Sequence, residues 1–220
     1  MEQYISIPKD IVDIPIIAFD KLDGNNIRCE WTRKGKVFEK FGSRKVLLGE
    51  DSWLAPAIPL IKAQEEAIVK VMRDERWEKA TLFFEFHGPN SFAGQHQEGD
   101  VMVATLIDVF VYKKGYLLPN DFVKLFCGDN LLPNEFMKLF RGNTLINTPD
   151  ILYRGKPNQD FISSVKDGTL PGITSEGVVC KGLPTKRGYP PTMFKIKTNA
   201  WLEKVKAKYA EDPKLLEYLI

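Results

Sequence analysis

The sequence contains few cysteines and histidines. Cys29, Cys127 and Cys180 are odd in number and far apart, and no C-x-x-C pair occurs. A disulfide framework uses an even set of cysteines, and zinc sites use closely spaced ligands. The two histidines, His87 and His96, lie nine positions apart with no cysteine nearby. The sequence therefore indicates neither a disulfide-rich protein nor a zinc site, and it fits a reducing cytoplasm.

Long hydrophobic runs and a strong charge of one sign are missing as well. No apolar stretch approaches the roughly 18 residues that a membrane span requires. Lysine and arginine total 31 against 29 acidic residues, which leaves a formal net charge of +2. This balance excludes nucleic-acid binding through a histone-like basic tail, but it leaves room for a local basic surface. We expect a soluble, cytoplasmic protein that does not enter a membrane.

The sequence does contain enough apolar residues for one substantial core. Of its 220 residues, 44% are apolar and 27% are charged, which suits a single domain spanning residues 1–220. Apolar residues at spacings of two predict strands, and spacings of three or four predict helices, so we expect an α+β fold. The strands are expected at residues 4–7, 14–19, 81–86, 101–112, 151–153, 176–181 and 192–197, with a hairpin at 27–41. The helices are expected at residues 61–73, at 158–166 and in two pieces after residue 198.

Residues 117–128 and 131–142 form a tandem repeat, LLPNDFVKLFCG and LLPNEFMKLFRG. Each unit predicts a short helix that stops at a glycine, Gly128 or Gly142. Two units are too few for a solenoid, so we interpret the repeat as a duplicated packing helix.

The segment Lys21-Leu22-Asp23-Gly24 follows the apolar strand predicted at residues 14–19. The amine of Lys21 therefore lies at the end of a strand, beside the turn that Asp23 and Gly24 predict. An amine attacks phosphorus only when it is unprotonated, whereas lysine normally has a pKa of about 10.4. Burial or neighbouring cations would have to lower that pKa. We therefore expect a pocket, cations and metal-binding carboxylates around Lys21.

Charged residues within other predicted strands could supply these groups. Glu85 and Asp108 interrupt apolar strands, where a carboxylate is costly to bury unless it meets a cation or a donor. Lys195 and Lys197 project from the same face of one strand, and a phosphate between them would relieve their repulsion. Arg44 follows a glycine bend. It could reach a phosphate, but two adjacent cations after such a bend usually lie on a solvated surface, which its local sequence taken alone favours.

Taken in order, these motifs resemble those of the covalent nucleotidyltransferase superfamily, which includes ATP-dependent DNA ligases, RNA ligases and mRNA capping enzymes. The motifs are Lys21-x-Asp23-Gly24, Glu85-Phe86-x-Gly88, Asp108 in its apolar strand, Glu176-Gly177-Val178-Val179 and Lys195-x-Lys197. The chain is most similar to RNA ligases of the T4 phage RNA ligase 2 type, because Asn26 stands where DNA ligases and capping enzymes usually have an arginine. The resemblance covers about residues 15–205. It implies a nucleotidyltransferase fold, an ATP-grasp-like adenylation domain with antiparallel sheets flanked by helices.

The resemblance also implies a role for each motif residue. Lys21 would carry AMP, Lys195 and Lys197 would hold the α-phosphate, and the same cations would lower the pKa of Lys21. Glu176 and Asp108 would bind Mg²⁺ or Mn²⁺. The other nucleotide contacts would come from Asp23, Gly24, Asn26, Arg44, Glu85, Ile107 and Val178. At the position of Ile107, family members often have an aromatic residue that stacks on adenine.

The implied activity is the ATP-dependent joining of RNA ends, as in RNA repair. A lysyl-AMP intermediate would pass AMP to a 5′-phosphate, and a 3′-hydroxyl would then attack the activated end. The partner would be RNA with nicked or broken ends. We expect no C-terminal oligonucleotide-binding or helical domain after Lys197, and a partner protein could replace it. So compact a domain would suit a phage, and its location would then be the host cytoplasm.

Three alternatives stay open from the sequence. A minimal DNA ligase or a capping-type nucleotidyltransferase would use the same motifs, although both normally need a further domain after the second lysine pair. A non-catalytic module that binds nucleic-acid ends would keep the fold without turnover. The sequence also leaves open whether the substrate is a nick, a single-stranded break or a tRNA loop.

Overall fold

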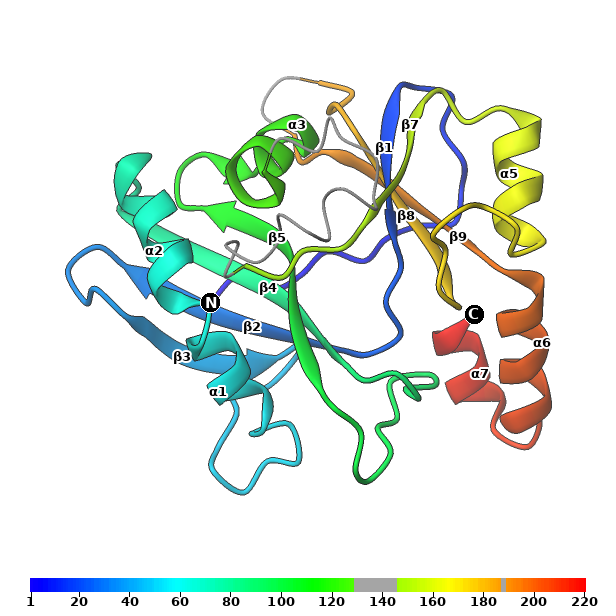
Figure 1. Ribbon diagram of the computed structural model, residues 1–220, viewed down its shortest axis with the longest axis horizontal. Coiled ribbons are helices and arrows are strands. Elements are labelled where there is room, and N and C mark those ends of the chain that lie inside the picture. Colours follow the sequence, from blue (N-terminus) through cyan, green and yellow to red (C-terminus); the bar gives the residue numbers. More distant parts are fainter. Residues whose placement is uncertain (129–145, 187–188) are drawn as a thin grey trace.

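Two antiparallel sheets organise the chain (Figure 1). The structure is a computed structural model that describes residues 1–128, 146–186 and 189–220. Sheet A has the strand order β7 (Ile151–Gly155), β1 (Ile16–Asp20), β8 (Gly177–Gly182) and β9 (Thr192–Lys197). Sheet B has the strand order β3 (Phe38–Ser43), β2 (Asn25–Thr32), β4 (Lys79–His87), β5 (Val103–Val111) and β6 (Gly115–Tyr116). The mixed fold with antiparallel sheets that the sequence predicts is confirmed.

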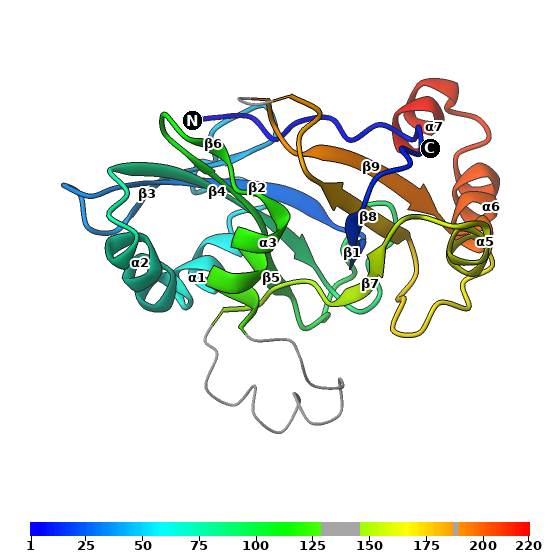
Figure 2. The same ribbon diagram turned by 90° about the horizontal axis from the view of Figure 1, so that it is seen from above.

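The helices gather in two groups (Figures 1 and 2). One face of sheet B is covered by α1 (Ala57–Lys62), α2 (Glu65–Asp74) and α3 (Pro119–Phe122), which continues as the π-helical turn η1 (Val123–Cys127). The end of the molecule formed by sheet A carries α5 (Gln159–Lys166), α6 (Asn199–Lys208) and α7 (Pro213–Leu219). Among the helices described here, none is both long and apolar enough to cross a membrane.

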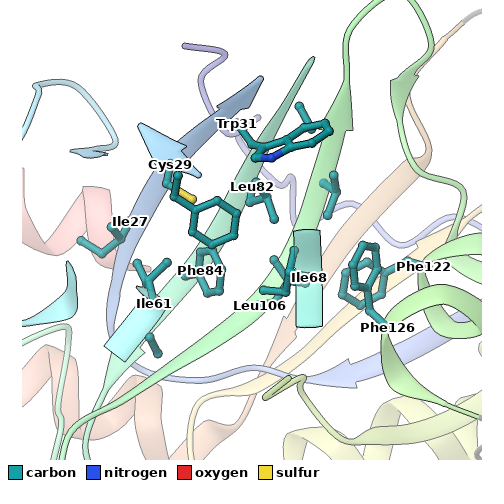
Figure 3. Close-up of a cluster of buried hydrophobic side chains, with 14 of the residues drawn as sticks. Ile27, Cys29, Trp31, Ile61, Ile68, Leu82, Phe84, Leu106, Phe122 and Phe126 are labelled. Carbon is teal, nitrogen blue, oxygen red and sulfur yellow. The ribbon is translucent and has the colours of Figure 1, made fainter. Parts of the chain in front are cut away.

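The larger core lies between sheet B and its helices (Figure 3). Alternate residues of β2, namely Ile27, Cys29 and Trp31, are fully buried there. These three side chains share one face of β2, because residues two positions apart on a strand point the same way. On that face they belong to one core with Leu82 and Phe84 of β4. Each large apolar side chain buried in this way contributes about 1.5–3 kcal/mol. The helices therefore hold sheet B from one side and leave its other face to the rest of the chain.

Strand β1 lies between two cores. All five of its residues are buried. Ile17 and Phe19 belong to the core of sheet B, whereas Ile16 and Ala18 pack with the α5 side chains Phe161 and Val165 in a second core. A strand covered on both faces reads as a continuous apolar run, as residues 14–19 do. The residue that follows β1 therefore emerges where the two sheets meet.

The N-terminal segment, residues 1–9, crosses the face of the sheets opposite α1, α2 and α3 (Figure 2). It explains why Arg28 and Glu30 on that face of β2 are buried. The Arg28 guanidinium donates to the carbonyl oxygen of Glu2 at 3.0 Å, and the amino group of Met1 lies 3.6 Å from the Glu30 carboxylate. At the other end, the backbone N–H of Lys195 in β9 donates to the carbonyl oxygen of Pro8 at 2.9 Å.

Two details of the predicted elements are wrong. Residues 4–7 form no strand. The helix predicted at 61–73 is two helices, α1 and α2. Between them, the buried side chain of Gln64 donates to the Ala104 carbonyl at 2.8 Å and accepts from the Asn147 N–H at 2.7 Å.

The first unit of the tandem repeat is helical, as predicted, and forms α3 and η1. Gly128 ends it with a φ of +71°, a conformation that glycine adopts without strain. The second unit, residues 131–142, lies outside the described residues.

One buried ion pair joins the two sheets, and we predict that breaking it destabilises the fold. The amine of Lys181 in β8 lies 2.8 Å from the Asp108 carboxylate in β5, and both side chains are at most 5% exposed. Because Lys181→Met leaves a buried carboxylate unpaired, it should lower the free energy of unfolding by about 3–5 kcal/mol. Urea denaturation of the variant and the wild type measures the difference.

A second substitution tests the cause. Adding Asp108→Asn to Lys181→Met removes the unpaired charge, so most of the lost stability should return. Lys70→Met breaks the exposed Lys70–Asp74 pair and should change stability by less than about 1 kcal/mol. Equal losses for the Lys181 and Lys70 variants would contradict the prediction.

Candidate active site

A cavity of about 540 Å³ opens where the ends of β1, β2, β4 and β9 meet. Its lining combines cationic side chains with carboxylates and amides. The residues predicted from the sequence that line it are Lys21, Asp23, Gly24, Asn26, Arg44, Glu85, Glu176, Lys195 and Lys197. The fold therefore brings together residues that are spread over most of the chain.

Lys21 is held at this place through its backbone. It directly follows β1, and its N–H donates to the carbonyl oxygen of Gly177 at 2.9 Å. Gly177 has a φ of +141°, and a Cβ there would lie 2.0 Å from the Ile196 carbonyl oxygen. Only glycine fits such a close approach between backbones. The glycine after Glu176 thus sets the distance between the Lys21 strand, β8 and β9.

The carboxylate of Glu176 bridges two lysines. Its Oε2 atom accepts from the Lys21 amine at 2.7 Å, and its Oε1 atom lies 2.9 Å from the Lys197 amine. The side chains of Glu176 and Lys197 are 6% and 7% exposed, whereas that of Lys21 is 20% exposed. Charge-assisted hydrogen bonds in such a sheltered place are strong. Lys21 is therefore oriented by Glu176 and still reaches the cavity.

Because of this bridge, the pKa of Lys21 shifts in the direction opposite to the one expected from the sequence. Neighbouring cations were expected to lower it, and burial does lower it. The carboxylates of Glu176 and Glu85 outweigh burial and raise the pKa of Lys21 above its usual value. The expectation of a lowered pKa is thus wrong for this structure, in which Lys21 is a cation paired with an acid.

The other two lysines of the site, Lys195 and Lys197, both have lowered pKa values, as expected for neighbouring cations. Burial, together with the positive charges of Lys197 and Lys21, lowers the pKa of Lys195 to about 8. Burial and Lys21 also lower the pKa of Lys197, while Glu176 opposes them. In addition, the Lys197 amine lies 3.9 Å from the centre of the Trp201 ring and donates to the carbonyl of Leu219 at the end of α7. A bound anion would stabilise both charged lysines.

Asp23 anchors the turn beside Lys21. Its carboxylate accepts from the backbone N–H groups of Ala93 and Gly94 at 2.6 and 2.7 Å and from the Trp201 indole at 2.9 Å. Ala93 and Gly94 both have positive φ angles, of +52° and +73°. With both oxygens occupied, Asp23 ties α6 and the 93–94 turn to the segment that carries Lys21. Its placement favours a positioning role over direct contact with a ligand.

Glu85 lies on β4, facing Lys21 across the cavity. Burial and the negative charges of Glu176 and Asp23 outweigh the opposing charge of Lys21 and raise the pKa of the Glu85 carboxyl to about 8. A carboxyl with such a pKa can donate or accept a hydrogen bond near neutral pH.

The remaining predicted residues lie on the cavity wall. The side-chain nitrogen of Asn26 is 3.5 Å from the Phe84 carbonyl, and its buried oxygen meets no donor in the described part of the chain. Gly24 is packed so tightly on β4 that a Cβ would lie 2.3 Å from the Phe86 carbonyl oxygen. Arg44 lines the cavity next to Lys45, just after β3.

A smaller apolar slot of about 80 Å³ opens beside Lys21 and shares Tyr4, Ile7, Lys21 and Glu85 with the cavity. Ile107 lines this slot, as predicted. Val178 does not: it is fully buried in the core of sheet A, and its neighbour Val179 lines the slot instead. Successive residues of a strand point to opposite faces, which explains the difference.

Asp108 also lies away from the cavity and the slot. Its carboxylate is 1% exposed and is paired with Lys181, so in this structure it supports the wall of the slot from behind. The lining residues that were missed from the sequence include Val179, Lys181 and Tyr4. Strand alternation could have placed Val179 and Lys181 on one face. No local signal in the sequence marked Tyr4.

The carboxylates of the cavity suit a divalent cation that is bound together with the phosphates of a ligand. In residues 1–128, 146–186 and 189–220, no group of three acidic, cysteine or histidine side chains could hold a metal by itself. Mg²⁺ often binds through one or two carboxylates together with substrate phosphates and water. Glu176 and Glu85 line the cavity. Each oxygen of Glu176 already contacts a lysine amine, so a metal would bind there only in exchange for one of these contacts.

The sequence matches no protein-family model and no curated protein. Solved structures of an RNA ligase from Naegleria gruberi do match. A mutant with ATP and Mn aligns with a TM-score of 0.57 and 18% identity, covering 87% of this chain and 52% of the ligase. The ligase with PPi gives 0.57 and 18%, covering 89% and 52%, and an apo mutant gives 0.58 and 19%, covering 89% and 52%. The fold resembles that of an RNA ligase. This chain spans about half the length of those ligase chains.

Glu85 generates a prediction about pH. Its raised pKa means that the folded state binds a proton more tightly than the unfolded state, so the wild type loses stability as the pH rises from about 4.5 to about 8. Glu85→Gln mimics the protonated form. Its melting temperature should equal that of the wild type near pH 5 and exceed it by several degrees at pH 8.5.

Thermal melts of both proteins at several pH values measure this difference. Glu75→Gln, at the exposed end of α2, controls for the loss of one negative charge. A melting-temperature difference for Glu85→Gln that stays constant with pH would refute the prediction.

Proposed function

We propose that this protein is an ATP-dependent RNA ligase that forms a covalent lysyl-AMP intermediate on Lys21. The observation that carries the proposal is the bridge of Glu176 between Lys21 and Lys197, located where the polar cavity meets the apolar slot. This arrangement offers an amine to an α-phosphate, cations to its oxygens and an apolar place for a base. The Naegleria ligase structures hold ATP and Mn, AMP and Mn, or PPi, which supports a nucleotide and a divalent metal here.

The first step would be in-line attack of the Lys21 amine on the α-phosphorus of ATP. A phosphorus–nitrogen bond forms, the bond to pyrophosphate breaks, and Lys21 must lose a proton. The Glu176 oxygen 2.7 Å from the amine is placed to accept that proton. Lys195 and Lys197 would stabilise the negative charge that develops on the phosphate oxygens. A bound Mg²⁺ or Mn²⁺ would neutralise further phosphate charge.

The second and third steps would join RNA ends. AMP passes from Lys21 to the 5′-phosphate of an RNA end, which frees the amine. The 3′-hydroxyl of another end then attacks the activated phosphate and releases AMP. Arg44 and Lys45 on the cavity wall are placed to meet the phosphates of the incoming strand.

Labelling tests the covalent step. Incubation with α-labelled ATP and Mg²⁺, followed by denaturation, should leave label on the wild type and none on Lys21→Ala, because the phosphoramidate needs that amine. Lys70→Ala, an exposed lysine on α2, should be labelled like the wild type. Label on Lys21→Ala would refute the assignment of the nucleophile.

The same assay and a sealing assay separate the alternatives. Label from GTP and not from ATP would point to a capping-type enzyme, and no label from either would point to a module that binds ends. A labelled protein is then given a nicked duplex with RNA or DNA on the 3′-hydroxyl side. Sealing with RNA supports the proposal, whereas sealing with DNA alone would make the protein a DNA ligase.

A further inference from the structure

Tyr4 stands out because it lines both the polar cavity and the apolar slot. It belongs to the N-terminal segment, which crosses the open face of both sheets (Figure 2). That segment is fixed on either side of Tyr4. Arg28 of sheet B binds the Glu2 carbonyl, and Lys195 of sheet A binds the Pro8 carbonyl. Tyr4 is therefore held over the junction of the sheets, next to Lys21.

The ring of Tyr4 has a fixed orientation. Its centre lies 4.9 Å from that of the Phe83 ring, at an interplanar angle of 42°. Its hydroxyl donates to the Asp108 carboxylate at 3.4 Å. Asp108 is itself held by Lys181 at 2.8 Å. The buried ion pair behind the slot thus helps to orient an aromatic ring at its entrance.

The rest of the slot offers little aromatic surface. Two of the described residues that line it are aromatic, Phe19 and Tyr4, and Phe19 is only 2% exposed. Ile107 and Val179 add aliphatic side chains. A flat base entering from the cavity would therefore find its aromatic contact in Tyr4.

We propose that Tyr4 is a specificity-determining residue of the nucleotide site, whose ring packs against the adenine of ATP. This inference rests on the proposed function and adds to it. It assigns the aromatic wall to the N-terminal segment, whereas β5 provides only Ile107 at the slot. It also makes the segment of residues 1–9 a part of the nucleotide site, linked to both sheets.

The test separates the base from the phosphates. Binding is measured by calorimetry with α,β-methylene-ATP, which cannot transfer AMP, and with tripolyphosphate, which has no base. For Tyr4→Leu, the dissociation constant for α,β-methylene-ATP should rise about tenfold, as expected for loss of a base–aromatic contact. The constant for tripolyphosphate should stay within about twofold of the wild type. Tyr4→Phe should bind both ligands like the wild type, because it keeps the ring.

Two further variants serve as a control for Tyr4→Leu and as a replacement for it. Tyr112→Leu, a tyrosine that is 55% exposed after β5, controls for loss of a tyrosine elsewhere. Tyr4→Met keeps an apolar side chain against Phe83 and replaces Tyr4→Leu if that variant fails to fold.

Each result decides the inference. Unchanged binding of α,β-methylene-ATP by Tyr4→Leu or Tyr4→Met would overturn it and leave the lysyl-AMP chemistry intact. Parallel weakening of both ligands would also overturn it, because Tyr4 would then support the site as a whole. A wild type that binds tripolyphosphate and α,β-methylene-ATP equally well would show that no base is recognised. Absence of lysyl-AMP in the labelling assay would instead count against the proposed function itself.

Discussion

The Glu176 carboxylate, shared by Lys21 and Lys197 at 2.7 and 2.9 Å, is the interaction on which the candidate site depends. It holds together three strands, since Lys21 follows β1, Glu176 precedes β8 and Lys197 ends β9. A buried carboxylate with only one cation would be costly, and two buried lysines without an acid would repel each other. The three charges are compatible with burial only together. The same bridge raises the pKa of Lys21, so an attack by its amine requires that the proton first pass to an acceptor such as the Glu176 oxygen 2.7 Å away.

Two carboxylates near this bridge are held by partners of their own. Asp23 is held by two backbone N–H groups and the Trp201 indole, and Asp108 is held by Lys181. Neither carboxylate is available to a ligand without losing these partners. Some charges at the cavity are thus open to a ligand, Glu85 and Lys195 among them, whereas Asp23 and Asp108 hold parts of the surrounding structure in place. This division explains why a chain with balanced net charge can present a locally cationic site.

The N-terminal segment joins the two sheets, because it is hydrogen-bonded to Arg28 of sheet B and to Lys195 of sheet A. The helices α1, α2 and α3 cover one face of sheet B, and residues 1–9 cross the opposite face (Figure 2). The segment buries Arg28 and Glu30, two charges that would otherwise face solvent on β2. It contributes Tyr4 and Ile7 to the slot. A stretch without regular secondary structure is therefore part of the wall of the site.

The sequence alone determined the strands that carry the charged motifs. In each of them, polar and apolar residues alternate, or an apolar run contains or adjoins a charged residue. It also determined which charges would be gathered: Lys21, Glu85, Glu176, Lys195 and Lys197 all line one cavity. Only the tertiary structure decided how those charges are paired, and hence that the pKa of Lys21 is raised. It likewise decided that Asp108 meets Lys181, that Val179 and not Val178 faces the slot, and that Tyr4 reaches it. The reason is physical: a motif fixes residue types within one strand, whereas pKa values and contacts depend on distances between strands that are far apart in the chain.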